Sequence, residues 1–133
     1  MKGLFGFTVI MVALLLSGSA FAQELTFELN GKKYEAAKQD LNGYYIWADA
    51  KAACEGLVTP EDSHDDWFLP SKEELNAMYE QLQKKGVGNF ADEEYWSSSE
   101  KNGHVAYSLF FDKGEPNEEF KGDGRSVRCI RAL

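Results

Sequence analysis

Cys54 and Cys129 are the residues of the 133-residue chain with the clearest chemical potential, because they are its only cysteines. In an oxidising compartment two such cysteines are expected to form a disulfide bond. The bridge would close a loop of about 75 residues and stabilise the fold by about 4 to 5 kcal/mol in the chain-entropy model. The alternative is a redox-active or nucleophilic thiol, but the sequence has no C-x-x-C motif to favour it.

A second group of residues, between positions 61 and 66, could bind a divalent cation. Its candidate ligands are Asp62, Asp65 and Asp66, with His64 among them. Calcium requires about six to eight oxygen ligands, and this segment lacks the mid-loop glycine and final glutamate of an EF-hand. We therefore expect a solvated loop and no cofactor, with calcium as the one ion left open. Zinc is disfavoured, because the chain has two histidines and its cysteines are expected to be paired.

The string Glu115-Pro116-Asn117 resembles the motif with which true C-type lectins hold calcium and sugar hydroxyls. The Trp-Asn-Asp element that completes such a site is absent between this motif and the last cysteine, so we interpret the match as a coincidence in a turn. Residues 112–126 are still predicted to form a long polar loop, and loops on a rigid scaffold commonly bind ligands. The candidate ligand-binding residues are His104, Tyr107, Glu115, Asn117, Glu118 and Glu119.

The sequence predicts no catalytic residues. The serine run at residues 97–99 could supply a nucleophile, but no G-x-S-x-G elbow surrounds it. Large aromatic and apolar residues at element junctions usually belong to the core of a small domain. We assign Trp67, Leu69, Trp96 and Phe110 to that core.

The elements that would position these groups begin with a hairpin over residues 25–36. Its Asn30-Gly31 pair favours the positive φ angles of a type I′ turn. A first helix is predicted over residues 45–57, where apolar residues recur at helical spacing and Cys54 lies on the apolar face.

A second helix is predicted to begin after Ser71, which can form a capping box with Glu74. Strands are predicted at residues 95–99, 105–111 and 127–130. Because hairpin, helices and strands follow one another in separate blocks, the chain is expected to adopt an α+β fold with antiparallel sheets.

Residues 1–22 are predicted to form a cleavable signal peptide. An apolar run follows a single lysine, and Ala20 and Ala22 provide an A-x-A cleavage site before Gln23. The alternative is an uncleaved membrane anchor, but no stop-transfer pattern follows the run. We therefore expect a periplasmic or secreted protein with a single domain over residues 23–133 and no membrane span after cleavage.

The expected mature domain is strongly acidic. The chain has 14 basic and 22 acidic side chains, and removal of residues 1–22 takes away one lysine, so its formal net charge becomes 13 − 22 = −9. Proteins bind nucleic acids mainly by neutralising phosphates with Lys and Arg, so nucleic acid is not expected as a partner.

Five short motifs follow one another along residues 43–131. They are Trp47-Ala48-Asp49-Ala50 with Cys54 after it, Trp67-Phe68-Leu69-Pro70-Ser71, Tyr95-Trp96-Ser97-Ser98-Ser99, Phe111 with Gly114, and Val127-Arg128-Cys129-Ile130-Arg131. In this order they resemble the C-terminal domain of Legionella collagen-like proteins, and the Fibrobacter succinogenes major paralogous domains share the layout. One position departs from the family pattern, since Phe68 stands where the family usually has Arg.

The resemblance implies a C-type-lectin-like fold: two helices packed on small antiparallel sheets, and a disulfide from the first helix to the last strand, which Cys54 and Cys129 match. Fold alone does not decide function. Collagen-like adhesins use this domain to attach to host glycans, so our leading hypothesis is an exported, non-catalytic binding module for a glycan or protein at the cell envelope or outside the cell. The alternatives are an envelope structural or assembly component, and an enzyme on a formylglycine-generating-enzyme-like scaffold.

Overall fold

The computed structural model of the protein describes residues 24–133. The predicted signal peptide, residues 1–22, lies outside the described residues. No helix within residues 24–133 combines the length and apolar character needed to cross a bilayer. The elements are β1 (Thr26–Leu29), β2 (Lys32–Ala36), α2 (Trp47–Glu55), α3 (Lys72–Gln81), the 3-10 helix η1 (Gln83–Lys85), β3 (Glu94–Glu100), β4 (Val105–Phe110), β5 (Glu115–Phe120) and β6 (Ile130–Ala132).

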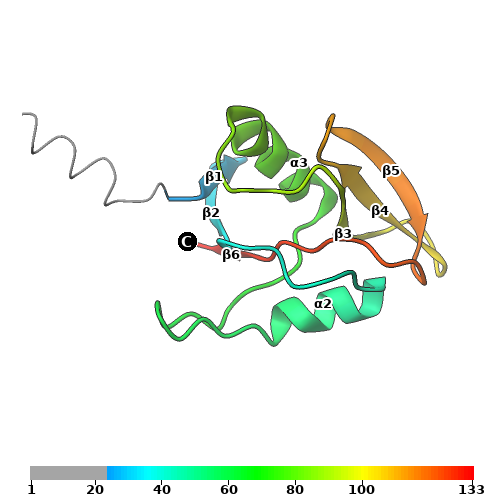
Figure 1. The fold of residues 1–133 in the computed structure, drawn as a ribbon, viewed down its shortest axis with the longest axis horizontal. Helices are drawn as coiled ribbons and strands as arrows, with labels where there is room; N and C mark the ends of the chain where they lie inside the picture. Colours follow the sequence, from blue (N-terminus) through cyan, green and yellow to red (C-terminus); the bar gives the residue numbers. More distant parts are fainter. Residues whose placement is uncertain (1–23) are drawn as a thin grey trace, which may run out of the picture.

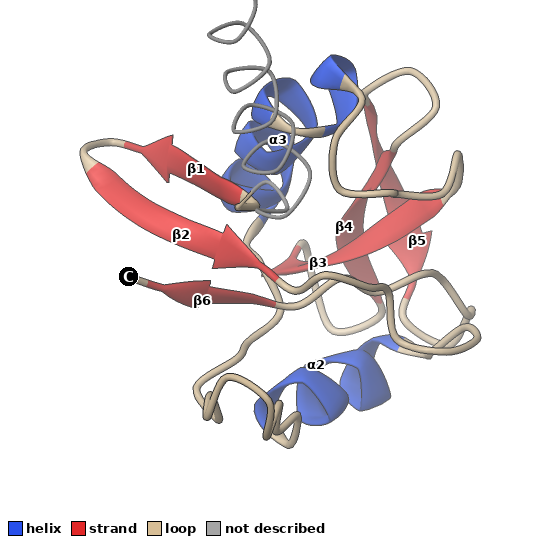
Figure 2. Cartoon of the chain, turned by 60° about the vertical axis from the view of Figure 1, so that its left-hand side comes forward, coloured by secondary structure: helices blue, strands red, loops and turns tan. Residues whose placement is uncertain are grey.

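The strands form two antiparallel sheets of three, in the orders β1-β2-β6 and β3-β4-β5. Figures 1 and 2 show α3 and α2 on opposite sides of the strands. Helix α3 packs on β1, β3 and β4, whereas α2 packs on β3. This architecture confirms the α+β prediction. The more specific C-type-lectin-like assignment stays a prediction.

The first hairpin forms where the sequence predicts it. Asn30 and Gly31 have φ angles of 53° and 82°, and Leu29 faces Lys32 across the turn. Only residues that tolerate the left-handed region make such a turn without strain. Strand β2 then pairs with β6 on its other side, so the first and last strands of the domain flank the same central strand.

Helix α3 begins with the predicted capping box. The Glu74 N–H donates to the Ser71 Oγ at 3.1 Å, and the Ser71 N–H donates to the Glu74 Oε1 at 2.8 Å. Leu75 and Met78 are buried on the inner face of the helix. A glutamine at the C-terminal end, Gln81, exchanges two hydrogen bonds with the backbone of β1, which fixes the helix against the first sheet.

Helix α2 carries one end of the predicted disulfide, and the structure confirms the bond between Cys54 and Cys129, with 5.5 Å between the Cα atoms. Both cysteines are buried in a cluster that also contains Trp47, Trp67 and Trp96. The bridge therefore joins α2 to the segment that leads into β6 within this buried cluster.

Several predicted boundaries are wrong. The long polar loop over residues 112–126 contains strand β5, and β6 starts at Ile130 instead of spanning residues 127–130. Strand β5 was missed because proline and glutamate are poor strand formers, and pairing with β4 determines its conformation. The first helix is also shorter than residues 45–57. Among the predicted core residues, Phe110 is only partly buried, while its neighbour Phe111 is 1% exposed.

Candidate functional site

An open groove lies between α3 and the β4–β5 hairpin, with Leu29 of β1 at one side. We call it the α3–β5 groove, and its volume is about 580 Å³. Buried Leu75 and Leu109 form its base, and Pro116 adds a further apolar contact from β5. Ligand pockets in proteins usually measure about 300–1,000 Å³ and are mostly apolar, with a few polar groups. The groove has both properties.

An aromatic wall is supplied by Tyr107 of β4. The Lys72 Nζ, at the first residue of α3, lies 4.1 Å from the centre of the Tyr107 ring. This cation–π contact bridges the helix and the sheet across the groove and covers one face of the ring. The width of the groove is therefore defined by a specific contact as well as by the packing beneath it.

The exposed margin of the groove is polar. Glu73 and Asn76 lie on the α3 side, and Glu118 lies on the β5 side. The Lys101 Nζ is 2.8 Å from the Glu118 carboxylate, and this hydrogen bond raises the pKa of Lys101 above its usual value. Within residues 24–133 no lysine, arginine or histidine nitrogen lies within 4.0 Å of the Glu73 carboxylate.

The structure divides the predicted ligand residues between two faces of the β3-β4-β5 sheet. Tyr107 is opposite Glu118, and both project toward α3, so they line the groove. Asn117 also contributes to the groove, but its Nδ2 donates to Glu94 and Glu119. Three of the six predicted residues therefore contact this site.

Glu119 belongs to a hydrogen-bonded network centred on Glu94, whose side chain is 8% exposed. The Glu94 carboxylate accepts from Ser108, from Asn117 and from the Arg125 Nε, and the same arginine pairs with Glu119 at 2.7 Å. A carboxylate this deeply buried is stabilised by several charged or polar donors. The network ties β3, β4 and β5 to the segment before β6.

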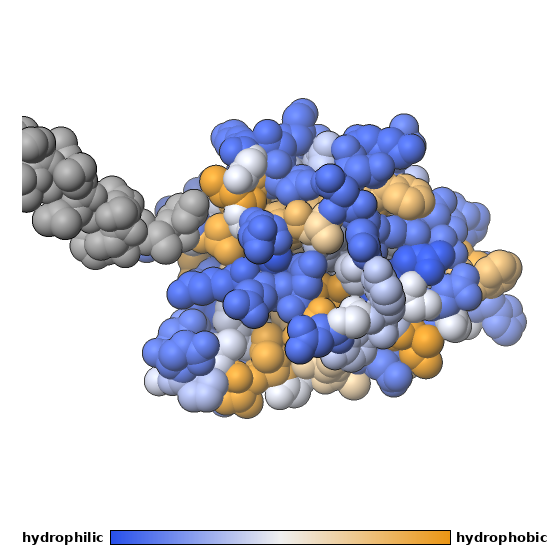
Figure 3. All heavy atoms as spheres, viewed as in Figure 1, coloured by the Kyte–Doolittle hydropathy of each residue, from blue (hydrophilic) through white to orange (hydrophobic). Residues whose placement is uncertain are grey.

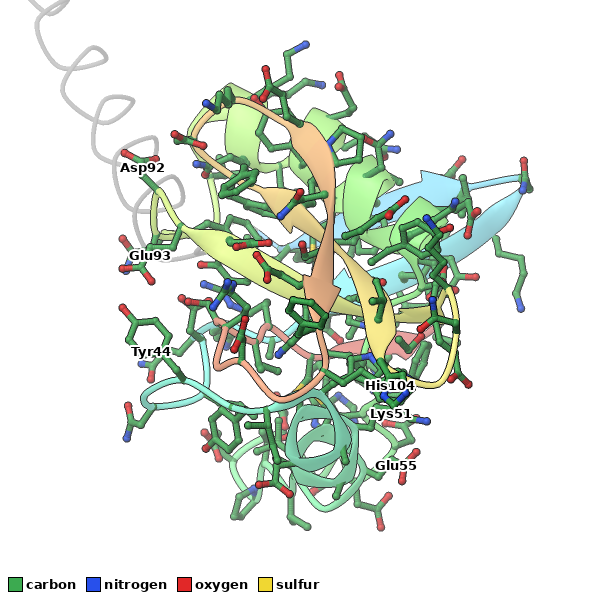
Figure 4. The ribbon with its side chains drawn as sticks, turned by 90° about the vertical axis from the view of Figure 1, so that its right-hand side faces the viewer. Tyr44, Lys51, Glu55, Asp92, Glu93 and His104 are labelled. Atoms are coloured by element: carbon green, nitrogen blue, oxygen red, sulfur yellow. A yellow bond between two sulfur atoms is a disulfide. The ribbon has the colours of Figure 1, made fainter. Side chains whose placement is uncertain are left out.

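The remaining predicted residues lie away from the groove. Glu115 is exposed, 3.8 Å from the Lys113 Nζ. His104 immediately precedes β4, and its carbonyl accepts from the Lys121 N–H. Figure 4 shows His104 at the opposite end of the sheet from Glu93.

The predicted metal ligands are not gathered at one point. Asp66 forms two hydrogen bonds with Arg131, at 2.7 and 3.2 Å, and this pairing lowers the pKa of Asp66. Asp65 is exposed, and Asp62 lines a separate cleft. Within residues 24–133 no group of three or more His, Cys, Asp or Glu side chains is arranged to hold a metal ion.

Sequence reasoning missed the helical side of the groove. Lys72, Glu73 and Asn76 are all exposed residues of α3. The helical period places Glu73 and Asn76 away from Leu75 and Met78, which was a usable signal for an exposed face. It could not show that β5 lies across from them.

The face of the molecule shown in Figure 3 is mostly hydrophilic, with hydrophobic residues scattered in small groups.

The fold and the groove define a small, disulfide-bonded α+β domain with an open apolar groove beside its second sheet. The Lcl C-terminal domain family model matches residues 22–131, and the chain belongs to this family. The match includes the first hairpin, which precedes the motifs noted in the sequence. No curated protein is significantly similar to the chain.

Proposed function

We propose that the protein is an exported, non-catalytic binding module that recognises a glycan or a protein at the cell envelope or outside the cell. The single observation that carries this proposal is the α3–β5 groove, because it combines an apolar base with polar groups held at fixed positions. The cation–π contact of Lys72 with Tyr107 and the ion pair of Lys101 with Glu118 order its walls. Because these walls are ordered before the ligand arrives, less side-chain conformational entropy is lost on binding.

A variant that fills the groove tests the proposal. Asn76→Trp places a large side chain at an exposed groove position of α3, and Glu80→Trp places the same side chain at an exposed position of α3 that does not line the groove. Both variants and the wild type are applied to a glycan array and to a pull-down from the native envelope. The wild type and Glu80→Trp should retain the same ligand, and Asn76→Trp should lose it. Equal retention by all three, or no ligand for any, would contradict the proposal.

Export of the protein and binding without a metal ion are further parts of the proposal. Cleavage after Ala22 is supported by the A-x-A sequence. The intact mass of the protein recovered from a periplasmic extract should therefore equal that of a chain that begins at Gln23. We expect binding without a metal, since Asp66 is held by Arg131. A rise in melting temperature on adding millimolar calcium would overturn this point.

A further inference from the structure

Resting on this proposed function, we infer that the ligand of the α3–β5 groove is an extended peptide segment. It presents an apolar side chain to the base of the groove and basic residues to its margin. The inference thus chooses a protein partner over a glycan for this site. It follows from three features of the groove, which are its aliphatic floor, the carboxylates at its margin and the exposed carboxamide of Asn76.

The base of the groove is aliphatic. Leu75 and Leu109 are 1% and 4% exposed, and Leu29 and Pro116 extend this surface. A sugar placed here would turn hydroxyl groups toward carbon atoms and lose hydrogen bonds with water, at a large cost in free energy. Stacking on Tyr107 is restricted, because the Lys72 ammonium group covers one face of its ring. An aliphatic or aromatic side chain meets neither obstacle.

The margin of the groove favours positive charge. It carries the carboxylates of Glu73 and Glu118 and the ammonium groups of Lys72, which contacts the Tyr107 ring, and of Lys101, which pairs with Glu118. The Glu73 carboxylate lies more than 4.0 Å from the basic nitrogens of residues 24–133, in a domain with an expected net charge of 13 − 22 = −9. Glu118 is 48% exposed although it pairs with Lys101, and Glu73 is exposed. Lys or Arg residues on both sides of the apolar anchor would therefore find complementary partners.

A carboxamide group is available for the ligand backbone. Asn76 is exposed at the groove, and a primary amide offers a donor and an acceptor that match the C=O and N–H of an extended chain. Gln81 of the same helix already holds β1 in this way, donating to the Glu28 carbonyl at 2.8 Å and accepting from its N–H at 2.9 Å.

The peptide is expected to lie in the groove and not to extend the sheet at β5. Strand β5 is the edge of its sheet, but Pro116 lacks an N–H and glutamates occupy three of the other positions of the strand. Proline and charged residues at an edge are features that oppose strand addition. Recognition therefore depends on side chains of α3 and β4 as much as on β5.

Selection of a random 12-residue peptide library displayed on phage tests the inference, with the wild type, Glu80→Trp and Asn76→Trp as targets. Sequences enriched on the first two should place an apolar residue between Lys or Arg residues, and Asn76→Trp should not retain them. For an enriched synthetic peptide, Glu73→Gln should weaken binding about two- to fivefold. Asn76→Ala should weaken it about two- to tenfold.

Three results would overturn the inference. They are enrichment of acidic or uncharged sequences, enrichment that is equal on Asn76→Trp, and no enrichment at all. The glycan array separates these from failure of the proposed function. A glycan that is retained by the wild type and lost by Asn76→Trp would support the proposed binding function and refute the inference that the ligand is a peptide. If neither peptides nor glycans nor envelope components depend on the groove, both proposals fail.

Discussion

Replacing Arg128 by methionine should destabilise the domain far more than the same replacement of an arginine near the surface. The Arg128 side chain is fully buried, and its Nε is 2.8 Å from the Asp40 carboxylate. Its other nitrogens donate to the backbone carbonyls of Ala37, Gly88 and Asn89, so four of its five N–H groups are used. One side chain thus holds together three segments that are distant in sequence.

The expected magnitude follows from burial. Removing one member of a buried ion pair costs about 3–5 kcal/mol, because the remaining groups lose their partner without regaining water. Arg131 is the matched control. It binds two carboxylates, those of Glu35 and Asp66, but its side chain is 14% exposed, and its partner Asp66 is 54% exposed. Pairs of this exposed kind contribute about 0–1 kcal/mol. We therefore expect Arg128→Met to cost at least about 2 kcal/mol more than Arg131→Met.

Urea unfolding of the oxidised protein measures the difference. With a slope of about 1.5 kcal/mol per molar urea, the unfolding midpoint of Arg128→Met should lie more than about 1 M below that of Arg131→Met. Midpoints within about 0.5 M of each other would refute the reasoning. If Arg128→Met does not fold, Asp40→Asn provides the test, since it removes the charge and keeps one acceptor. It should cost about 1–3 kcal/mol.

Three further predictions concern the disulfide, the helix cap and acid stability. Replacing Cys54 and Cys129 by serine should cost about 4.5 kcal/mol, from the chain-entropy model at a separation of 75 residues; urea unfolding measures the loss, and uptake of two alkyl labels by the unreduced protein would contradict the bond itself. Ser71→Ala removes half of the capping box and should lower stability by about 1 kcal/mol, again by urea unfolding. Pairing with Arg131 lowers the pKa of Asp66 below its ordinary value of 3.8, so the contribution of this pair is complete above that pH and is lost as the pH falls through the lower, folded-state pKa. Melting temperatures between about pH 5 and 2 should therefore fall more steeply for the wild type than for Arg131→Met, and parallel curves would contradict the assignment.

Local sequence signals predicted the elements whose own residues make the required hydrogen bonds. The Asn30-Gly31 turn and the Ser71–Glu74 capping box each depend on neighbouring residues, so their conformation follows from sequence. Strand β5 lacked such a signal. Its backbone is held by pairing with β4, a partner that sequence reasoning could not assign to a segment read as a loop.

The candidate site was only half predictable for the same reason. The sequence favours Tyr107 and Glu118 as ligand residues because they lie in or near a predicted polar loop, and the β4–β5 register places them opposite each other at the groove. The same register turns Glu119 to the other face, where Arg125 binds it. A change of one position along a strand moves a side chain to the opposite face, so composition alone could not separate these roles.

The disulfide pairing, the acidic charge, the hairpin turn and the cap of α3 follow from the sequence, because each depends on residue types or on close neighbours along the chain. The groove and the buried arginine depend on how the chain folds. The groove exists because α3 packs against β4 from a distant part of the sequence, and Arg128 is buried because two separate segments, residues 37–40 and 88–89, bring acceptors to it. Such sites arise from contacts between remote residues, and their geometry is set only when the whole chain has folded.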